Sequence, residues 1–270
     1  MKCHDLTKRL GSSTESRMLL RHVIGLSDAD LIIMDDIQMS EAQQAQLDDC
    51  IKQRLAGRPI AKIIGVKEFY GRDFIVSDDV LDPRPDSETL IDCVLNYAQG
   101  QRDLRILDMG AGTGCLVLTL LAELSDMQGV ASDISVDALS IAQQNARALN
   151  VDDRMQFIES NWFENVEGMF DVIISNPPYI ESAVIPKLDV DVRKYDPILA
   201  LDGGKNGLNP YEVILPQIRN YLKKGGFMAL EHGYDQANRI APLIAGAGLA
   251  DIQMHSDLAG HNRIITAIHK

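Results

Sequence analysis

The chain has 270 residues, of which 46% are hydrophobic and 24% are charged, and its formal net charge at pH 7 is −13. This length allows one large domain, or a medium domain with a smaller one, of ordinary globular composition. The acidic balance disfavours a nucleic-acid substrate, because proteins that bind phosphates carry a basic face. No apolar run approaches the roughly 18 residues of a membrane span, and residues 1–10 lack a signal peptide's apolar core. We therefore expect a cytoplasmic protein with no membrane partner.

The cysteines and histidines indicate no metal site. The four cysteines are widely spaced and form no Cys-x-x-Cys pair, and the six histidines form no His-Glu-x-x-His pattern. Zinc sites and disulfide frameworks both depend on such spacings. We therefore expect reduced thiols and no bound metal.

Residues 1–60 are predicted to form a small helical domain. Apolar residues at helical spacing mark helices over 13–24 and 41–56, and Ser40 opens the second of these with a capping box. A short helix is also predicted over residues 28–34. Helices of this length need one another to bury their apolar faces. The domain is either a plain helical bundle or a docking module for a protein partner.

Residues 61–81 are predicted to form a β-hairpin linker. The segment Phe69–Val76 reads as a pair of short strands around Gly71. The stiff, proline-rich loop Leu81–Glu88 follows and leads into a helix. The third domain then spans residues 82–270.

In this third domain, strands alternate with helices. Such alternation indicates an α/β fold with a mostly parallel, doubly wound sheet. A long loop over residues 179–205 exceeds a plain connection and is predicted to be functional. A helix is predicted over 211–222. The strands are predicted at 104–108, 129–133, 155–158, 170–174 and 226–231, with a closing pair at 252–255 and 263–268.

A glycine-rich turn joins the first of these strands to the next helix. Glycines in such a turn let the backbone pass close to a ligand. A dinucleotide fingerprint would need glycine at Cys115 or Val117, and no Gly-Lys-Ser/Thr of a P-loop follows. The Asp-x-Gly-x-Gly-x-Gly spacing instead resembles the S-adenosylmethionine loop of class I methyltransferases. The predicted cofactor contacts in this turn are Asp108, Gly110, Ala111, Gly112, Thr113 and Gly114.

Two more cofactor contacts are predicted where the following strands end. Asp133 ends the second strand, about twenty residues after the glycine turn, where a carboxylate can accept hydrogen bonds from both ribose hydroxyls. Trp162, the only tryptophan, follows the third strand, and its ring could cover an adenine. The alternative for Trp162 is an aromatic residue that caps the core.

The motif Asn-Pro-Pro-Tyr, residues 176–179, follows the fourth strand. Proline fixes φ at about −65° and has no N–H, so this corner can present the Asn176 side-chain oxygen and the Pro177 carbonyl to a planar NH₂ group. Tyr179 could cover the flat face of such a group. The alternative is a plain proline turn after a strand. The predicted catalytic residues are Asn176, Pro177 and Tyr179, and the predicted substrate-binding residues are these three with Pro178.

In the glycine-rich turn, Asp133 and the Asn-Pro-Pro-Tyr motif, the chain resembles the HemK/PrmC family. The members of this family are the protein-(glutamine-N5) methyltransferases that act on peptide chain release factors. The resemblance covers nearly the whole chain. Asn-Pro-Pro-Tyr alone is shared with adenine-N6 methyltransferases, so the segments Glu68–Gly71 and Pro83–Glu88 are what narrow the resemblance to this family. The chain departs from the family pattern at Asp82, Asp86, Ser87, His232 and Lys194–Tyr195.

The resemblance implies a class I (Rossmann-like), seven-stranded methyltransferase domain after an N-terminal helical domain and a β-hairpin. It implies S-adenosyl-L-methionine as cofactor and S-adenosyl-L-homocysteine as product. It also implies a protein substrate, the glutamine of the Gly-Gly-Gln motif of release factors, bound by the Asn-Pro-Pro-Tyr motif. By match of motif, it further implies that Asn176 contacts the cofactor. We expect a monomer that binds no nucleic acid directly. The alternatives are an adenine-N6 or other amino-group methyltransferase that uses the same pocket, a nucleotide-dependent dehydrogenase, and a non-catalytic module that binds a release factor.

Overall fold

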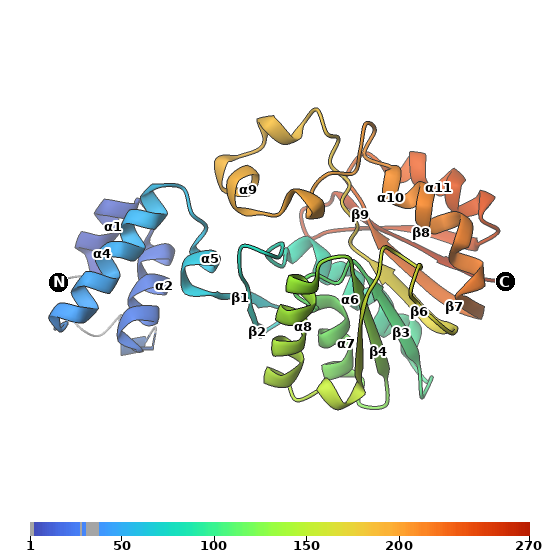
Figure 1. The fold of residues 1–270 in the computed structure, drawn as a ribbon, viewed down its shortest axis with the longest axis horizontal. Coiled ribbons are helices and arrows are strands. Elements are labelled where there is room, and N and C mark those ends of the chain that lie inside the picture. Colours follow the sequence, from blue (N-terminus) through green and yellow to red (C-terminus); the bar gives the residue numbers. More distant parts are fainter. Residues whose placement is uncertain (1–2, 28, 31–37) are drawn as a thin grey trace. The chain divides into compact units, whose positions relative to one another are not determined.

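The structure is a computed structural model that describes residues 3–27, 29–30 and 38–270. The chain divides into two compact units (Figure 1). The first comprises residues 1–66 with 189–195, and the second comprises residues 67–188 with 196–270. Most of the helix predicted over 28–34 lies outside the described residues. No helix in the described part of the chain has the length and apolar character needed to cross a membrane.

The first unit consists of short helices, and those formed by residues up to 64 pack around a small apolar core. Its helices are α1 (Cys3–Leu10), α2 (Ser13–Ile24), α4 (Glu41–Leu55), α5 (Ile60–Ile64) and α9 (Val190–Tyr195). The Ser40 capping box is confirmed, since Ser40 and Gln43 each accept a hydrogen bond from the backbone N–H of the other. Helix α5 was not predicted, because its five residues are too few to show a helical period. The core residues include Leu19, Leu20, Leu47 and Ile51.

The second unit is organised around a mixed sheet of seven strands in the order β5-β4-β3-β6-β7-β9-β8. Strands β3 to β7 pair in parallel, and β9 runs antiparallel to both of its neighbours. The predicted doubly wound α/β fold, including the closing strand pair, is confirmed. The strands are β3 (Arg105–Met109), β4 (Gln128–Asp133), β5 (Met155–Glu159), β6 (Phe170–Ser175), β7 (Leu222–Glu231), β8 (Ala250–Ser256) and β9 (Asn262–Ile268).

A separate two-stranded sheet forms the predicted hairpin. Strands β1 (Val66–Phe69) and β2 (Arg72–Ile75) are joined by Tyr70 and Gly71. Both of these turn residues have positive φ, +50° and +71°, and glycine adopts this conformation without steric cost.

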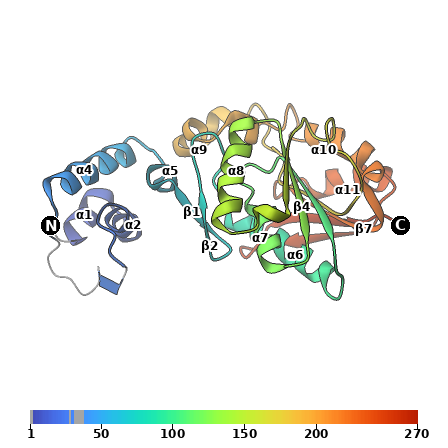
Figure 2. The ribbon, with the colours of Figure 1, turned by 60° about the horizontal axis from the view of Figure 1, so that its bottom comes forward.

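Helices cover both faces of the seven-stranded sheet and divide its core in two (Figures 1 and 2). Successive residues of a strand point to opposite faces, so Ile106 packs with α6 and α7, whereas Leu107 and Met109 pack with α10 and α11. Each fully buried Leu or Ile stabilises the fold by roughly 1.5–3 kcal/mol. The helices are α6 (Glu88–Ala98), α7 (Cys115–Glu123), α8 (Val136–Ala148), α10 (Asn209–Ile214) and α11 (Ala237–Gly246), and short 3₁₀ helices lie at Pro85–Ser87, Asp152–Arg154, Ile185–Lys187, Ile198–Ala200 and Leu215–Asn220.

The helix predicted over residues 211–222 is confirmed over 211–220, as an α-helix followed by a 3₁₀ helix, but its predicted end and the strand start predicted at 226 are wrong. Helix α10 ends at Ile214, a 3₁₀ helix follows, and β7 already begins at Leu222. Pro216 lies in the first turn of the 3₁₀ helix and has no N–H, so the α-helical hydrogen-bond pattern cannot continue through it. The register between β6 and β7 shifts before Phe227, so the first residues of β7 do not show a regular strand pattern.

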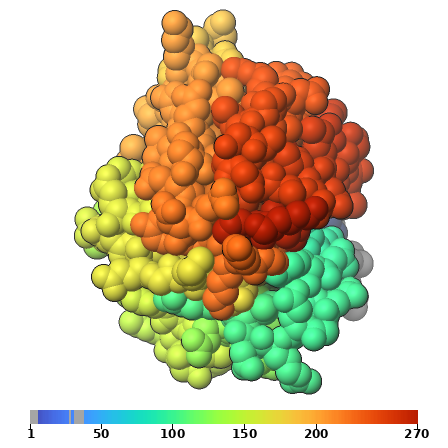
Figure 3. Space-filling view, turned by 90° about the vertical axis from the view of Figure 1, so that its right-hand side faces the viewer, coloured from blue at the N-terminus to red at the C-terminus, as the bar shows by residue number. Residues whose placement is uncertain are grey.

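The C-terminal strands pack against helix α6. In Figure 3 the orange and red C-terminal segments lie against the teal segment around residue 100. The rings of Tyr97 on α6 and Phe227 on β7 stack there, with 4.7 Å between their centroids. Stacking of this kind adds about 0.5–1.5 kcal/mol beyond area burial.

Candidate active site

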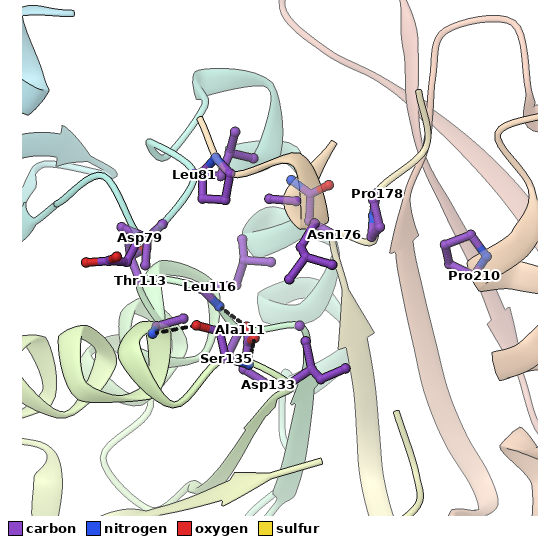
Figure 4. Close-up of a pocket in the computed structure, with 18 of the residues that line it drawn as sticks. Asp79, Leu81, Ala111, Thr113, Leu116, Asp133, Ser135, Asn176, Pro178 and Pro210 are labelled. Atoms are coloured by element: carbon purple, nitrogen blue, oxygen red, sulfur yellow. Dashed lines mark hydrogen bonds between the residues drawn. The ribbon is translucent and has the colours of Figure 1, made fainter. Parts of the chain in front are cut away.

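A pocket of 380 Å³ lies in the second unit where strands β3, β4 and β6 end (Figure 4). This volume is within the range of small-molecule and cofactor sites, and the carboxyl ends of parallel strands are where open α/β sheets bind ligands. Asp108, Gly114, Pro177 and Tyr179 do not line the pocket. The predicted site residues that do line it are Gly110, Ala111, Gly112, Thr113, Asp133, Trp162, Asn176 and Pro178.

The glycine-rich turn depends on backbone conformations that side chains disfavour. Gly112 has φ of +54° and Gly114 has φ of +76°. A Cβ on Gly114 would also lie only 2.9 Å from Leu118 Cδ1, inside helix α7. The turn therefore requires glycine at positions 112 and 114. Without side chains there, backbone groups of the turn can face the pocket.

Asp133 holds the turn in place while its carboxylate faces the pocket (Figure 4). Gly112 N–H donates to Oδ2 and Ser135 N–H donates to Oδ1, both over 2.9 Å. Each carboxylate oxygen can accept a second hydrogen bond. Asp133 can therefore receive two hydroxyl donors without releasing the turn.

Asp108 lies beneath the turn and is fully buried. Its Oδ2 accepts a hydrogen bond from Val117 N–H in the first turn of α7, over 3.3 Å, and Oδ1 has no partner within the described residues. Burial raises the pKa of Asp108 to about 8. Asp108 is therefore mainly a neutral acid at pH 7, with one hydroxyl that can still donate.

Trp162 has a backbone conformation that is rare for a bulky residue, with φ of +54°. The Ser160 hydroxyl donates to its carbonyl over 2.9 Å and helps to hold this turn. A Cβ on Gly110 would lie 3.9 Å from the Trp162 ring, so the ring packs directly beside the glycine turn, and both residues line the pocket. Strained residues of this kind cluster at ligand sites.

The Asn-Pro-Pro-Tyr motif is connected to a buried glutamate by hydrogen bonds at both of its ends. The Asn176 Nδ2 group donates to Ser87 Oγ over 3.3 Å, and the Ser87 hydroxyl donates to Glu231 Oε2. The Tyr179 hydroxyl donates to the other glutamate oxygen over 3.2 Å. The Tyr179 ring is thus anchored at Glu231 and does not cover the pocket.

Glu231 has a strongly perturbed environment at the end of β7. Its side chain is fully buried, and burial raises its pKa to about 7, against the opposing effects of the Ser87 and Tyr179 hydrogen bonds and the charge of Arg263. Titratable groups with such shifts mark functional sites more often than others.

Close backbone packing fixes the rest of the motif. Gly203 N–H donates to the Ile180 carbonyl over 2.8 Å. A Cβ on Gly203 would lie 2.8 Å from both the Pro178 carbonyl oxygen and Tyr179 Cα. The motif loop therefore depends on the absence of a side chain at Gly203.

Part of the pocket rim comes from two proline-containing segments that an ion pair connects. Arg84 Nη2 lies 2.7 Å from Asp196 Oδ2, and the Asp196 side chain is only 2% exposed. Beyond Asp196, Leu199 lines the pocket although 70% of its surface is exposed.

Comparison with known proteins assigns the chain to a family. Residues 72–190 match the methyltransferase small domain and residues 5–65 match the PrmC N-terminal domain. The release factor glutamine methyltransferase of Agrobacterium fabrum is 38% identical over 256 residues, which cover 93% of this chain and 89% of that protein. The chain belongs to the release factor glutamine methyltransferase family. The resemblance to the HemK/PrmC family is thus confirmed, and the protein is a methyltransferase.

Other relatives agree with this family. The release factor glutamine methyltransferase of Rhodospirillum rubrum is 39% identical over 253 residues, which cover 94% of this chain and 78% of that protein. A solved methyltransferase structure from Pyrococcus furiosus has a TM-score of 0.54 at 16% identity and covers 85% of this chain and 99% of that one. The latter comparison supports the fold, and the predicted seven-stranded methyltransferase fold is confirmed.

The sequence did not predict the residues that support the Asn-Pro-Pro-Tyr motif from distant positions in the chain. Ser87 and Glu231 lie 144 positions apart and meet only in the folded chain. Ser87 belongs to the segment Pro83–Glu88, which resembles the family, but no spacing rule connects a serine after a proline loop to a glutamate at a strand end. Leu199 lies in the long loop that was predicted to be functional, yet nothing in the loop's sequence singles it out.

Proposed function

We propose that the protein transfers a methyl group from S-adenosyl-L-methionine to the side-chain amide nitrogen of the glutamine in the Gly-Gly-Gln motif of peptide chain release factors. The observation that carries this proposal is that one pocket is lined by both the glycine turn and Asn176, in a chain 38% identical to a release factor glutamine methyltransferase. Release factors act in translation, so we expect the reaction to occur in the cytoplasm.

The glycine-turn side of the pocket fits the cofactor. The backbone of Gly110–Gly114 would contact it, and Asp133 has one free lone pair on each oxygen for the two ribose hydroxyls. Trp162 would cover the adenine, and the buried Asp108 would support the start of α7 behind the turn through its hydrogen bond with Val117 N–H. When bound, S-adenosyl-L-methionine supplies a methyl group on a positively charged sulfur.

The Asn176 side of the pocket fits the amide. An amide nitrogen is a poor nucleophile, because its lone pair is delocalised into the carbonyl. The Asn176 Oδ1 atom would accept a hydrogen bond from its NH₂ group at the pocket, and the Pro177 carbonyl oxygen, although Pro177 does not line the pocket, is the proposed second acceptor. These acceptors would stabilise the positive charge that develops on nitrogen and aim the nitrogen at the methyl group. Alignment of this kind contributes up to several kcal/mol to the rate.

The proton balance needs no dedicated base. As the N–C bond forms and the S–C bond breaks, the bonding electrons of the S–C bond stay on sulfur, and the nitrogen carries one proton too many. An amide protonated on nitrogen is a strong acid, so water can take this proton. Catalysis by this chain would rest on positioning and electrostatic stabilisation.

We further propose that the N-terminal helical region, predicted over residues 1–60, docks the release factor. The region matches the PrmC N-terminal domain over residues 5–65. Docking away from the reacting group supplies binding energy that can orient a protein substrate. We expect the protein to act as a monomer.

The experiment that tests the function is mass spectrometry of a bacterial release factor incubated with this protein and S-adenosyl-L-methionine. We expect one added methyl group on the glutamine of Gly-Gly-Gln, and none when that glutamine is changed to alanine. Parallel assays on DNA and RNA test the adenine-N6 alternative, which the net charge of −13 disfavours. Methylated adenine with an unmodified release factor would overturn the proposal.

A further inference from the structure

The hydrogen bonds around Ser87 have a direction that the chemistry of the groups dictates. A serine hydroxyl has a single proton. Ser87 Oγ lies within hydrogen-bond distance of Glu231 Oε2 on one side and of Asn176 Nδ2 on the other. An ionised carboxylate can only accept, so the Ser87 proton is directed to Glu231. Ser87 is therefore left with a lone pair toward Asn176.

This direction decides which end of the Asn176 amide faces Ser87. A lone pair can bind the amide NH₂ group but repels the amide oxygen, so Nδ2 must lie at Ser87. The Asn176 Oδ1 atom then lies on the opposite side. No donor reaches Oδ1 from the described residues, and Asn176 lines the pocket. Oδ1 is thus an acceptor that is available to a ligand.

We propose that Ser87 and Glu231 are positioning residues that hold the Asn176 amide with its oxygen toward the substrate. This inference rests on the proposed function, because the oxygen is useful only if the substrate presents an NH₂ group. If the Asn176 amide rotated by half a turn, two NH₂ groups would face each other and the substrate would be repelled. The orientation of one amide therefore decides whether the pocket accepts glutamine.

Glu231 is suited to this task by its place in the sheet. Ser175 pairs with Leu230 in the parallel register of β6 and β7, so Asn176 and Glu231 are the next residues at the same edge. The Tyr179 hydroxyl donates to the second carboxylate oxygen, and the Tyr211 hydroxyl holds the Glu231 carbonyl over 2.7 Å. Both carboxylate oxygens of Glu231 then accept hydrogen bonds from hydroxyl groups. Ser87 therefore donates to Glu231 and can only accept from Asn176.

Protonation of Glu231 would reverse the direction of these hydrogen bonds. A protonated carboxyl can donate to Ser87 Oγ, and the Ser87 proton must then turn toward Asn176, where it favours the amide oxygen. Burial raises the pKa of Glu231 to about 7, so this change occurs near neutral pH. The titratable and charged groups that act on Glu231 are Tyr179, Tyr211, Cys115, Arg263 and Asp86.

The first test compares the methylation of a release factor by Ser87→Ala and by Ser87→Thr. Ser140→Ala, on the exposed face of α8, is the control for the loss of a serine hydroxyl. We expect kcat to fall about tenfold or more in Ser87→Ala, with a smaller change in KM, because the misoriented amide affects the reacting geometry. Threonine keeps the hydroxyl and should restore most of kcat. Equal losses in the alanine and threonine variants would overturn the inference, because they would assign the effect to packing.

The second test is the pH profile of Glu231→Gln, with Glu167→Gln at an exposed site as the matched control. We expect the kcat of the unchanged protein and of Glu167→Gln to fall as the pH drops below about 7, and this acid limb to be absent in Glu231→Gln. An acid limb that persists in Glu231→Gln would overturn the inference while release factor methylation itself stands. Absence of any methyl transfer to glutamine by the unchanged protein would overturn the proposed function and this inference together.

Discussion

The two sides of the pocket are built in different ways. The glycine turn and Asp133 lie within a stretch of 26 residues and present mostly backbone groups, with one hydrogen bond joining Gly112 to Asp133. The Asn176 side depends on side chains from three distant segments, which meet at Ser87, Asn176 and Glu231. A backbone site is set by local conformation, whereas a side-chain site is set by the packing of the whole sheet.

The difference also concerns charge. Asp133 is partly exposed, and its carboxylate is stabilised by two backbone donors. Glu231 is buried, and its ionised form is disfavoured even with two hydroxyl donors. The Asn176 side of the pocket therefore contains a buried carboxyl group that lowers stability when it is ionised, as is common where function constrains the choice of residue.

The largest expected effect is that of Asn176→Ala, which removes the proposed acceptor. We expect kcat for release factor methylation to fall about a hundredfold to a thousandfold, as for other lost transition-state hydrogen bonds. The dissociation constant of S-adenosyl-L-methionine, measured by calorimetry, should change much less. Asn220→Ala at an exposed site is the control. Near-normal turnover of Asn176→Ala would show that Asn176 does not supply the acceptor for the substrate amide.

The next largest effect is expected for Glu231→Gln on stability. The pKa of Glu231 in the folded protein, about 7, is above its ordinary value of 4.5, so the folded state binds this proton more tightly. The stability from this group is therefore complete below that ordinary value and declines as the pH rises to the folded value. Glutamine avoids the decline, so the variant should be more stable by up to about 3 kcal/mol at about pH 8 and by less than about 1 kcal/mol at about pH 5.

Urea unfolding at both pH values would measure this difference, with Glu167→Gln for comparison. An equal gain at both pH values would mean that the buried charge of Glu231 is not the cause. If Glu231→Gln gains stability and also loses the acid limb of the kcat profile, Glu231 is kept for function at a cost in stability.

Asp133→Asn is expected to have a smaller effect, confined to the glycine-turn side. The amide keeps one acceptor oxygen but loses the charge and one acceptor, so we expect cofactor affinity to fall by roughly 2 kcal/mol. With the cofactor at saturation, kcat should stay within a few-fold of the unchanged protein. Isothermal titration with S-adenosyl-L-methionine checks the affinity, and Asp153→Asn at an exposed site is the control. Unchanged affinity in Asp133→Asn would remove this residue from the cofactor site.

Gly203→Ala should have the smallest effect among these variants. The new Cβ would lie 2.8 Å from the Pro178 carbonyl oxygen and Tyr179 Cα, so the motif loop has to shift. Overpacking of this kind costs about 1–2 kcal/mol of stability. We expect a lower melting temperature and a lower kcat with little change in cofactor affinity. Gly246→Ala, with no atom within 4 Å of the new Cβ, is the matched control and should not lower either value.

Much of the fold could be predicted because its signals are local. Alternating apolar runs and helical periods predicted all seven strands of the large sheet, and the capping box at Ser40 marked the start of α4. The predictions failed where a signal was short or irregular. Helix α5 has only five residues, and the first part of β7 precedes a shift in register.

For the candidate site, the sequence by itself determined the glycine turn, Asp133, Trp162 and the Asn-Pro-Pro-Tyr corner. Glycine and proline restrict the backbone wherever they occur, and a strand end before them predicts which edge of the sheet they reach. Only the tertiary structure decided that Tyr179 turns to Glu231 and that Ser87 lies between Glu231 and Asn176. Those contacts join residues up to 144 positions apart, and they exist only once parallel strands and the proline loop have packed into one edge of the sheet.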